Sequence, residues 1–209
     1  MTIKLEKRVF IGIPVGLNIK HILPQLKSTF NSNSNIIKWI PENNIHLTLS
    51  FLGNIPSETI PEIVDSLKKS VMVNYFKINI ENTGVFPTPK SPKILWMGIN
   101  KGADDLITLQ LEIEKSVREL KKNVRKDKYI PHVTIARIRR SHRKIDVLPF
   151  LKCVYSPIEL DVNSICLFES KLPALNVPCL CLHMQSPQQC TWQQYAASAL
   201  LLLRAGCIV

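Results

Sequence analysis

The chain has 209 residues, enough for one large domain or for two small lobes that share a core. Its hydrophobic content of 45% and charged content of 21% are ordinary for a soluble globular protein. The formal net charge of +11 favours polyanionic partners, with nucleic acid ahead of an acidic membrane surface; general basicity in a lysine-rich proteome is the alternative.

Cysteine usage and the first residues predict a cytoplasmic protein. The six cysteines include no CxxC pair, so neither a zinc site nor a disulfide framework is expected. No cationic segment followed by an apolar one opens the chain, so no secretion signal is expected. We therefore expect a reducing cytoplasm and no metal or cofactor.

The first third of the chain predicts strands around one helix. Residues 8–14 predict a strand that ends at Pro14 and Gly16, and residues 18–30 have the apolar spacing of a helix despite Pro24. Residues 31–35 are a polar loop. Residues 36–40 predict a short strand before Pro41, and a further strand runs to the turn at Gly53-Asn54.

Later elements repeat this order. Thr59-x-x-Glu62 predicts a capping box for a helix that carries Ile63 to Val71. Alternation predicts strands at 76–81 and 94–99 around a proline-rich loop, and Asp104 and Asp105 suit the start of a helix that reaches Leu120. A basic segment (121–128), another strand, a short helix (144–151) and strands near 157–162 and 164–169 follow. This order predicts an α+β duplication with mostly antiparallel sheets.

The last 36 residues differ in composition from the rest. Residues 1–173 form the predicted domain, whereas residues 174–209 contain Arg204 as their single Lys or Arg and no acidic residue. The apolar run 196–203 is far shorter than the roughly 17–25 residues that span a bilayer. We predict that residues 174–209 are a divergent, poorly ordered tail.

A short motif occurs twice, at His46-Leu47-Thr48-Leu49 and His132-Val133-Thr134-Ile135. Strict alternation predicts two half-buried strands. In the first, His46, Thr48 and Ser50 would share one face and Leu47, Leu49 and Phe51 the other. In the second, His132, Thr134 and Ala136 would share the polar face. We predict that both polar faces meet in one cleft.

Two histidines of this kind suit metal-independent phosphoryl chemistry. With an unperturbed pKa of about 6.5, a neutral imidazole accepts a proton from water while a charged one donates a proton to a departing oxygen. Thr48 and Thr134 would hold the non-bridging phosphate oxygens. Arg137 would add positive charge, but strict alternation places it on the face opposite His132, so this role requires a bend after Ala136 that the sequence does not show.

A structural role or a metal site would account for the motif less well. A single His-x-Thr is more often structural, but two copies with similar flanks are hard to attribute to chance. A metal site needs further ligands, and no Asp, Glu or Cys lies within five residues after either histidine. The remaining histidines, at 21, 142 and 183, lie on a predicted helix, in a basic run and in the tail, so no catalytic role is expected for them.

The motifs and their order resemble the two-histidine phosphoesterase superfamily, and within it the RNA 2′,3′-cyclic phosphodiesterases, also called 2′-5′ RNA ligases. The resemblance covers roughly residues 8–172. It depends on the following segments: Arg8–Ile13, Trp39, His46–Gly53, Gly84–Pro87, Leu95–Ile99, Pro131–Arg137 and Leu167–Ser170. The chain departs from the family after Leu172, where another strand is usual.

The resemblance implies a bilobal, pseudo-twofold α+β fold in which two mostly antiparallel sheets form a central cleft with helices outside. It implies hydrolysis of RNA 2′,3′-cyclic phosphate ends to 2′-phosphomonoesters, with weak reversible 2′-5′ ligation as a secondary activity. His46 would be the general acid and His132 the general base, with the roles exchanged in the reverse reaction. Thr48, Thr134 and Arg137 would bind the phosphate. Phe10 is expected in the core in preference to a base-stacking position.

The expected partner is RNA with a 2′,3′-cyclic phosphate end, with no membrane and a monomeric protein. Arg139, Arg140, Arg143 and Lys144 would hold upstream nucleotides, or else form a solvated loop. The alternative function is a non-catalytic RNA- or nucleotide-binding module on the same scaffold. A structural protein with a membrane-associating tail is disfavoured by the short apolar run.

Overall fold

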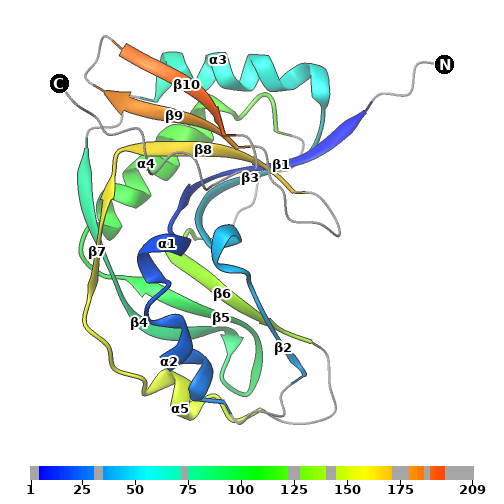
Figure 1. The fold of residues 1–209 in the computed structure, drawn as a ribbon. Helices are drawn as coiled ribbons and strands as arrows, with labels where there is room; N and C mark the ends of the chain where they lie inside the picture. Colours follow the sequence, from blue (N-terminus) through cyan, green and yellow to red (C-terminus); the bar gives the residue numbers. More distant parts are fainter. Residues whose placement is uncertain are drawn as a thin grey trace.

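A computed structural model gives the arrangement of the elements (Figure 1). The structure describes residues 5–30, 35–71, 75–121, 128–139 and 145–170, and the backbone of residues 179–185 and 189–195. The helices are α1 (Gly16–Ile19), α2 (Leu23–Ser28), α3 (Ile60–Ser70), α4 (Ala103–Ser116) and α5 (Leu148–Leu151), with single 3-10 turns η1 (Glu42–Asn44) and η2 (Ser57–Thr59).

The strands of the described residues form one curled antiparallel sheet (Figure 1). They are β1 (Glu6–Pro14), β2 (Ile37–Trp39), β3 (His46–Pro56), β4 (Phe76–Thr88), β5 (Ser91–Ile99), β6 (His132–Ile138), β7 (Ile158–Val162), β8 (Ser164–Glu169), β9 (Cys179–Gln185) and β10 (Gln189–Tyr195). Their order is β10-β9-β8-β1-β3-β6-β5-β4-β7, with β2 paired to β6.

The sheet has two halves that meet between β3 and β6. In the described part of the chain these two strands share one residue pair, Leu47 with Val133. Helices α3 and α4 pack beside the half that contains β3, and α5 packs on β4 in the other half. The α+β class with mostly antiparallel pairing is confirmed, and the two predicted sheets are joined through this pair.

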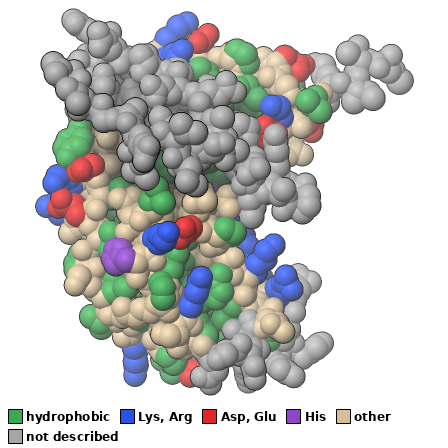
Figure 2. Space-filling model, viewed as in Figure 1, with side chains coloured by type: hydrophobic (Ala, Val, Ile, Leu, Met, Phe, Trp, Pro, Cys, Tyr) green, Lys and Arg blue, Asp and Glu red, His purple; other side chains and the backbone are tan. Residues whose placement is uncertain are grey.

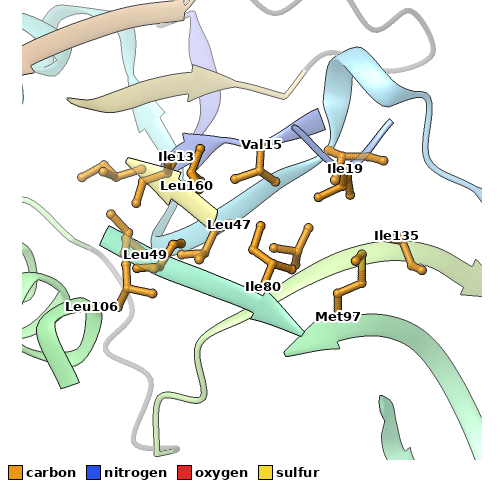
Figure 3. Packing of buried hydrophobic residues seen from close by; sticks show 14 of the residues in the cluster. Ile13, Val15, Ile19, Leu47, Leu49, Ile80, Met97, Leu106, Ile135 and Leu160 are labelled. Carbon is orange, nitrogen blue, oxygen red and sulfur yellow. The ribbon is translucent and has the colours of Figure 1, made fainter. Parts of the chain in front are cut away.

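The hydrophobic core lies on one face of the two central strands (Figure 3). Leu47 and Leu49 of β3 lie among Ile13, Met97 and Leu106, and Leu47 is fully buried. On β6, Val133 and Ile135 are fully buried as well. Apolar residues at alternate positions therefore place the first halves of both strands on the core, as the sequence predicts.

Local differences from the predicted elements have physical causes. The helix predicted over residues 18–30 is two short helices, α1 and α2. Pro24 lies in the first turn of α2, where its missing N–H is not required, whereas within a continuous helix its ring would clash with the preceding turn. Thr59 is the N-cap of α3, but its side chain makes no capping hydrogen bond, so the predicted capping box does not form.

Strands β9 and β10 lie in the segment predicted to be a poorly ordered tail. β9 pairs with β8 from Phe168 opposite Cys179 to Ser164 opposite His183, and β10 pairs with β9. This pairing extends the sheet beyond residue 173, and the domain boundary there stays a prediction. Of the described cysteines, Cys153 is free, while Cys166 is part of a disulfide although the cysteine spacing predicted none.

Candidate functional site

The two His-x-Thr motifs lie side by side at the centre of the sheet. Because Leu47 is opposite Val133 in an antiparallel pair, His46 is placed opposite Thr134, and Thr48 opposite His132. Leu47 and Val133 face the core, so these four residues lie on the other side of the sheet, which we call the histidine face. His46 and His132 are then diagonal neighbours on adjacent strands. In a regular antiparallel ladder, the backbone positions of such a pair are roughly 7–8 Å apart.

The two motif strands have the same burial pattern over six residues. From His46 to Phe51 and from His132 to Arg137 the order is half-buried, buried, half-buried, buried, buried, exposed. The two adjacent buried positions mark a β-bulge in each strand. Gly12 pairs with Thr48 and Ile11 with Ser50, which leaves Leu49 as the extra residue. Trp96 pairs with Thr134 and Leu95 with Ala136, which leaves Ile135 as the extra residue.

The bulges correct the predicted faces of four residues. An extra residue inverts the alternation beyond it. Ser50 and Ala136, predicted on the polar face, are buried, at 2% and 0% exposure. Phe51 and Arg137, predicted on the opposite face, are exposed and lie on the histidine face. The bend required for Arg137 thus exists, but it precedes Ala136 rather than following it.

Each histidine is oriented by the same backbone contact. His46 Nδ1 lies 2.7 Å from the carbonyl oxygen of Asn44, and His132 Nδ1 lies 2.7 Å from that of Ile130. A carbonyl only accepts, so each Nδ1 carries the hydrogen and donates it. In the neutral form each Nε2 is then left as the basic nitrogen, which is the arrangement that a proton-transferring imidazole needs.

Burial lowers the pKa of both histidines, and neighbouring charges lower that of His46 further. For His46 burial is the main cause, and the positive charges of Arg137 and His132 add to it, while the bond to Asn44 opposes them. Burial also lowers the pKa of His132, and the bond to Ile130 opposes it. The positive charges of Arg137 and His132 therefore both act on the titration of His46.

Aromatic rings flank both histidines. The His46 ring stacks on Phe10, with centroids 4.5 Å apart, and lies 5.4 Å from Phe168. The His132 ring meets Phe86 edge to face at 5.0 Å and Trp96 at 6.1 Å. Phe10 is opposite Phe51 on β3 and Phe168 on β8, which gives a row of three rings across neighbouring strands on the histidine face.

The prediction that Phe10 belongs to the core is only partly correct. It is 8% exposed, but it is covered by His46, Phe51 and Phe168 rather than by the apolar cluster that contains its neighbours Val9 and Ile11. The sequence did not single out Phe51, Phe86, Trp96 or Phe168 as neighbours of the histidines. Their signal was present in the segments that carried the family resemblance.

A scan against family models matches residues 25–172 to the 2′-5′ RNA ligase superfamily. This chain belongs to that superfamily. A relative from Aquifex aeolicus named RNA 2′,3′-cyclic phosphodiesterase is 31% identical over 175 residues, which are 80% of this chain and 90% of the relative. A protein of the same name from Thermotoga maritima is 28% identical over 166 residues, covering 79% and 87% of the two chains.

Solved structures of other proteins share this fold. The Thermus thermophilus protein TT0787 has a TM-score of 0.66 at 19% identity, covering 91% of this chain and 97% of that one. Escherichia coli LigT in complex with 3′-AMP has a TM-score of 0.66 at 16% identity, covering 92% and 98%. The curled antiparallel sheet of this superfamily member is therefore a known architecture.

The remaining candidate residues lie away from the motifs or outside the described residues. His21 is exposed between α1 and α2. His142, Arg140, Arg143 and Lys144 lie outside the described residues, as does the side chain of His183. Within the described ranges, no group of three or more His, Cys, Asp or Glu side chains is placed to hold a metal ion.

Charged side chains are spread over the face of the molecule drawn in Figure 2. On the face drawn in Figure 2, described Lys and Arg side chains are scattered among apolar and acidic ones and form no single patch. A hollow of about 340 Å³ beside α3 and α4, lined by residues such as Glu62 and Lys115, contains none of the candidate residues. No helix among the described residues is long and apolar enough to cross a membrane.

Proposed function

We propose that this protein is an RNA 2′,3′-cyclic phosphodiesterase that opens the cyclic phosphate at an RNA 3′ end to a 2′-phosphomonoester. The observation that carries the proposal is the pair of histidines on one face of adjacent strands, each with Nδ1 bonded to a carbonyl two residues earlier. The names of the relatives at 28–31% identity support the same substrate class.

The reaction needs one charged and one neutral imidazole. The neutral His132 takes a proton from water through Nε2 as the water oxygen attacks phosphorus. The bond from phosphorus to O3′ breaks on the opposite side, and His46 gives its proton to O3′. Water is thereby added across the P–O3′ bond with no change in total charge, and each imidazole contributes on the order of 10²–10⁴-fold to the rate.

Hydroxyl and guanidinium groups stabilise the phosphate during this step. Thr48 and Thr134 lie two residues after the histidines on the same face, so their hydroxyls donate to the non-bridging oxygens. Arg137 supplies positive charge from beyond the bulge of β6. Phe51, 37% exposed and beside Phe10, offers a ring on which a nucleobase stacks.

The same groups could act on an RNA 5′-hydroxyl as the nucleophile. If an RNA 5′-hydroxyl replaces water, the product is a 2′-5′ linkage, and the two histidines exchange acid and base roles in its cleavage. Water is present in large excess, so ligation is the weak secondary activity. We further propose that the protein is cytoplasmic and that it acts as a monomer. Sedimentation of the purified protein tests the monomeric state.

The test is turnover of nucleoside 2′,3′-cyclic phosphates by EDTA-treated protein, with the product identified as 2′- or 3′-monophosphate. We expect the 2′-monophosphate, and a loss of about 10²-fold or more for His46→Ala and for His132→Ala. His21→Ala is the matched control because His21 is exposed and lies on neither motif strand, and its rate should equal that of the wild type.

Two outcomes would contradict the proposal. A 3′-monophosphate product would exclude the assigned leaving group. No turnover of mono- or oligonucleotides, together with salt-sensitive RNA binding, would favour the non-catalytic binding module. Both histidines are retained in this chain, and a module that only binds RNA has no chemical need for the pair.

A further inference from the structure

The carbonyl oxygen of Thr48 is held by a side chain from the other half of the protein. In the described residues β3 and β6 pair only at Leu47 and Val133, so the ladder does not continue to Thr48. The hydroxyl of Tyr129 donates to the Thr48 carbonyl at 3.0 Å. A partly buried tyrosine hydroxyl thus takes the place that a strand amide would fill in a longer ladder.

Tyr129 is next to the residue that orients the second histidine. The carbonyl of Ile130 accepts the Nδ1 hydrogen of His132 at 2.7 Å, and Tyr129 is bonded to the strand of His46. Only one peptide unit separates these two hydrogen bonds. A displacement of Tyr129 relative to Thr48 is therefore transmitted to the group that sets the position and tilt of the His132 ring.

Thr48 directly precedes the β-bulge of β3 at Leu49. A buried ionic network holds this bulge from its core face. The Ser50 hydroxyl donates to Glu114 at 2.8 Å, and Lys121 Nζ lies 2.8 and 2.9 Å from the two carboxylate oxygens of Glu114. Ser50 is 2% exposed and the Lys121 side chain 3%. Buried polar groups of this kind require one another, so the network fixes the bulge and leaves Tyr129 to connect it to the second motif.

We propose that Tyr129 is a positioning residue that sets the separation of the two imidazoles. Its hydrogen bond joins the backbone of β3 to the segment that directly precedes β6. The proposal rests on the proposed function for its catalytic consequence. Tyr129 does not touch the reacting atoms. It acts through Thr48 on one side and through Ile130 and His132 on the other.

The chain offers a matched control. The hydroxyl of Tyr155 also donates to a backbone carbonyl, that of Asn82, at 2.8 Å, and burial raises the pKa of both tyrosines. Tyr129→Phe and Tyr155→Phe each remove one hydroxyl and no packing atoms, and each leaves one carbonyl without its donor. Both variants should therefore fold, and the fall in Tm should be no larger for Tyr155→Phe, whose hydrogen bond is exposed, than for Tyr129→Phe, whose hydrogen bond is partly buried.

Kinetics separate the two variants. Misplacement of reacting groups by about 1 Å costs up to roughly 10²-fold in rate, so we expect Tyr129→Phe to lower kcat by about 10- to 100-fold. The KM for a nucleoside cyclic phosphate should stay within about twofold of the wild type in both variants, because the phosphate and base contacts are retained. The kcat of Tyr155→Phe should be that of the wild type. Equal losses of kcat in both variants, or none in Tyr129→Phe, would overturn the proposal.

A second measurement does not depend on turnover. NMR titration of the imidazole Hε1 signals reports the pKa of His46, which the positive charge of His132 lowers. When the rings separate, this effect weakens, so the pKa of His46 should rise in Tyr129→Phe and stay constant in Tyr155→Phe. An unchanged pKa in Tyr129→Phe contradicts positioning. If the wild type lacked turnover, the proposed function would fail while this comparison still decided the role of Tyr129.

Discussion

Arg137 occupies in β6 the position that Phe51 occupies in β3. Each is the fifth residue after a motif histidine, and each reaches the histidine face because of a bulge between the threonine and itself. The duplicated strands thus place a cation on one side of the site and an aromatic ring on the other. We infer that this difference orients the substrate, with phosphate oxygens toward Arg137 and the base toward Phe51.

Replacing Arg137 should weaken transition-state binding and change the titration of His46. A charge-assisted hydrogen bond is worth about 1.5–3 kcal/mol, so Arg137→Gln should lower kcat/KM by roughly 10- to 100-fold. The positive charge of Arg137 also lowers the pKa of His46, so that pKa should rise in the variant, as measured by NMR. Lys101→Gln, at an exposed turn, is the control; a loss of similar size there would indicate a general charge effect.

Replacing Phe51 should raise the KM only for substrates that carry a nucleobase. Stacking of a base on an aromatic ring contributes about 1–3 kcal/mol, so Phe51→Leu should raise the KM for nucleoside 2′,3′-cyclic phosphates by about fivefold or more. Ribose 2′,3′-cyclic phosphate without a base should be hydrolysed equally well by both proteins. An equal loss with both substrates would instead assign Phe51 to support of the Phe10–His46 stack.

The pH dependence of kcat/KM should be bell-shaped with its maximum on the acid side of the ordinary histidine pKa. Catalysis requires one charged and one neutral imidazole, a state populated between the two apparent pKa values of the pair. Burial lowers both pKa values from 6.5. Each imidazole therefore loses its proton at a lower pH than free histidine, and the alkaline limb begins below about pH 6.5. A maximum near pH 8 would contradict these lowered values.

A substrate with an easier leaving group should distinguish the acid from the base. In a 2′,3′-cyclic phosphorothiolate with sulfur at the 3′ bridging position, the leaving thiolate needs little protonation. His46→Ala should then recover most of its lost rate relative to the oxygen substrate, whereas His132→Ala should stay impaired by about 10²-fold because water still needs a base. The opposite pattern would exchange the two roles.

Alternation predicted the strands and the faces of His46, Thr48, His132 and Thr134, because each motif precedes its bulge. Beyond that point it was wrong for Ser50 and Ala136, since one extra residue inverts the side chains that follow it, in β3 as far as a second register shift at Leu52. The bulged segments themselves, residues 48–50 and 134–136, contain no glycine, so the two motif strands carry no local signal for a bulge. The bulges follow from pairing with β1 and β5, which are distant in the chain.

Contacts between segments that are distant in the chain could not be predicted from the sequence either. Tyr129 and Thr48 are 81 positions apart, and the bond between them depends on where two half-sheets meet. The repeated motif predicted two strands with His and Thr on one face, and the resemblance to the superfamily predicted an α+β fold with mostly antiparallel pairing, which the structure confirms. The catalytic roles of the two histidines stay a prediction. It did not predict that β9 continues the sheet from β8, because residues 174–209 lack the composition of the rest of the chain.

A single rung between Leu47 and Val133 also has a mechanical consequence. Within each half of the sheet, backbone pairing runs along β1 with β3 and along β4 with β5, so we expect each half to resist bending. Among the described residues, Leu47 and Val133 are the one pair that β3 and β6 share across the junction. We infer that a change in the angle between the two halves of the sheet would alter the distance between His46 and His132, because these residues lie on opposite sides of this junction.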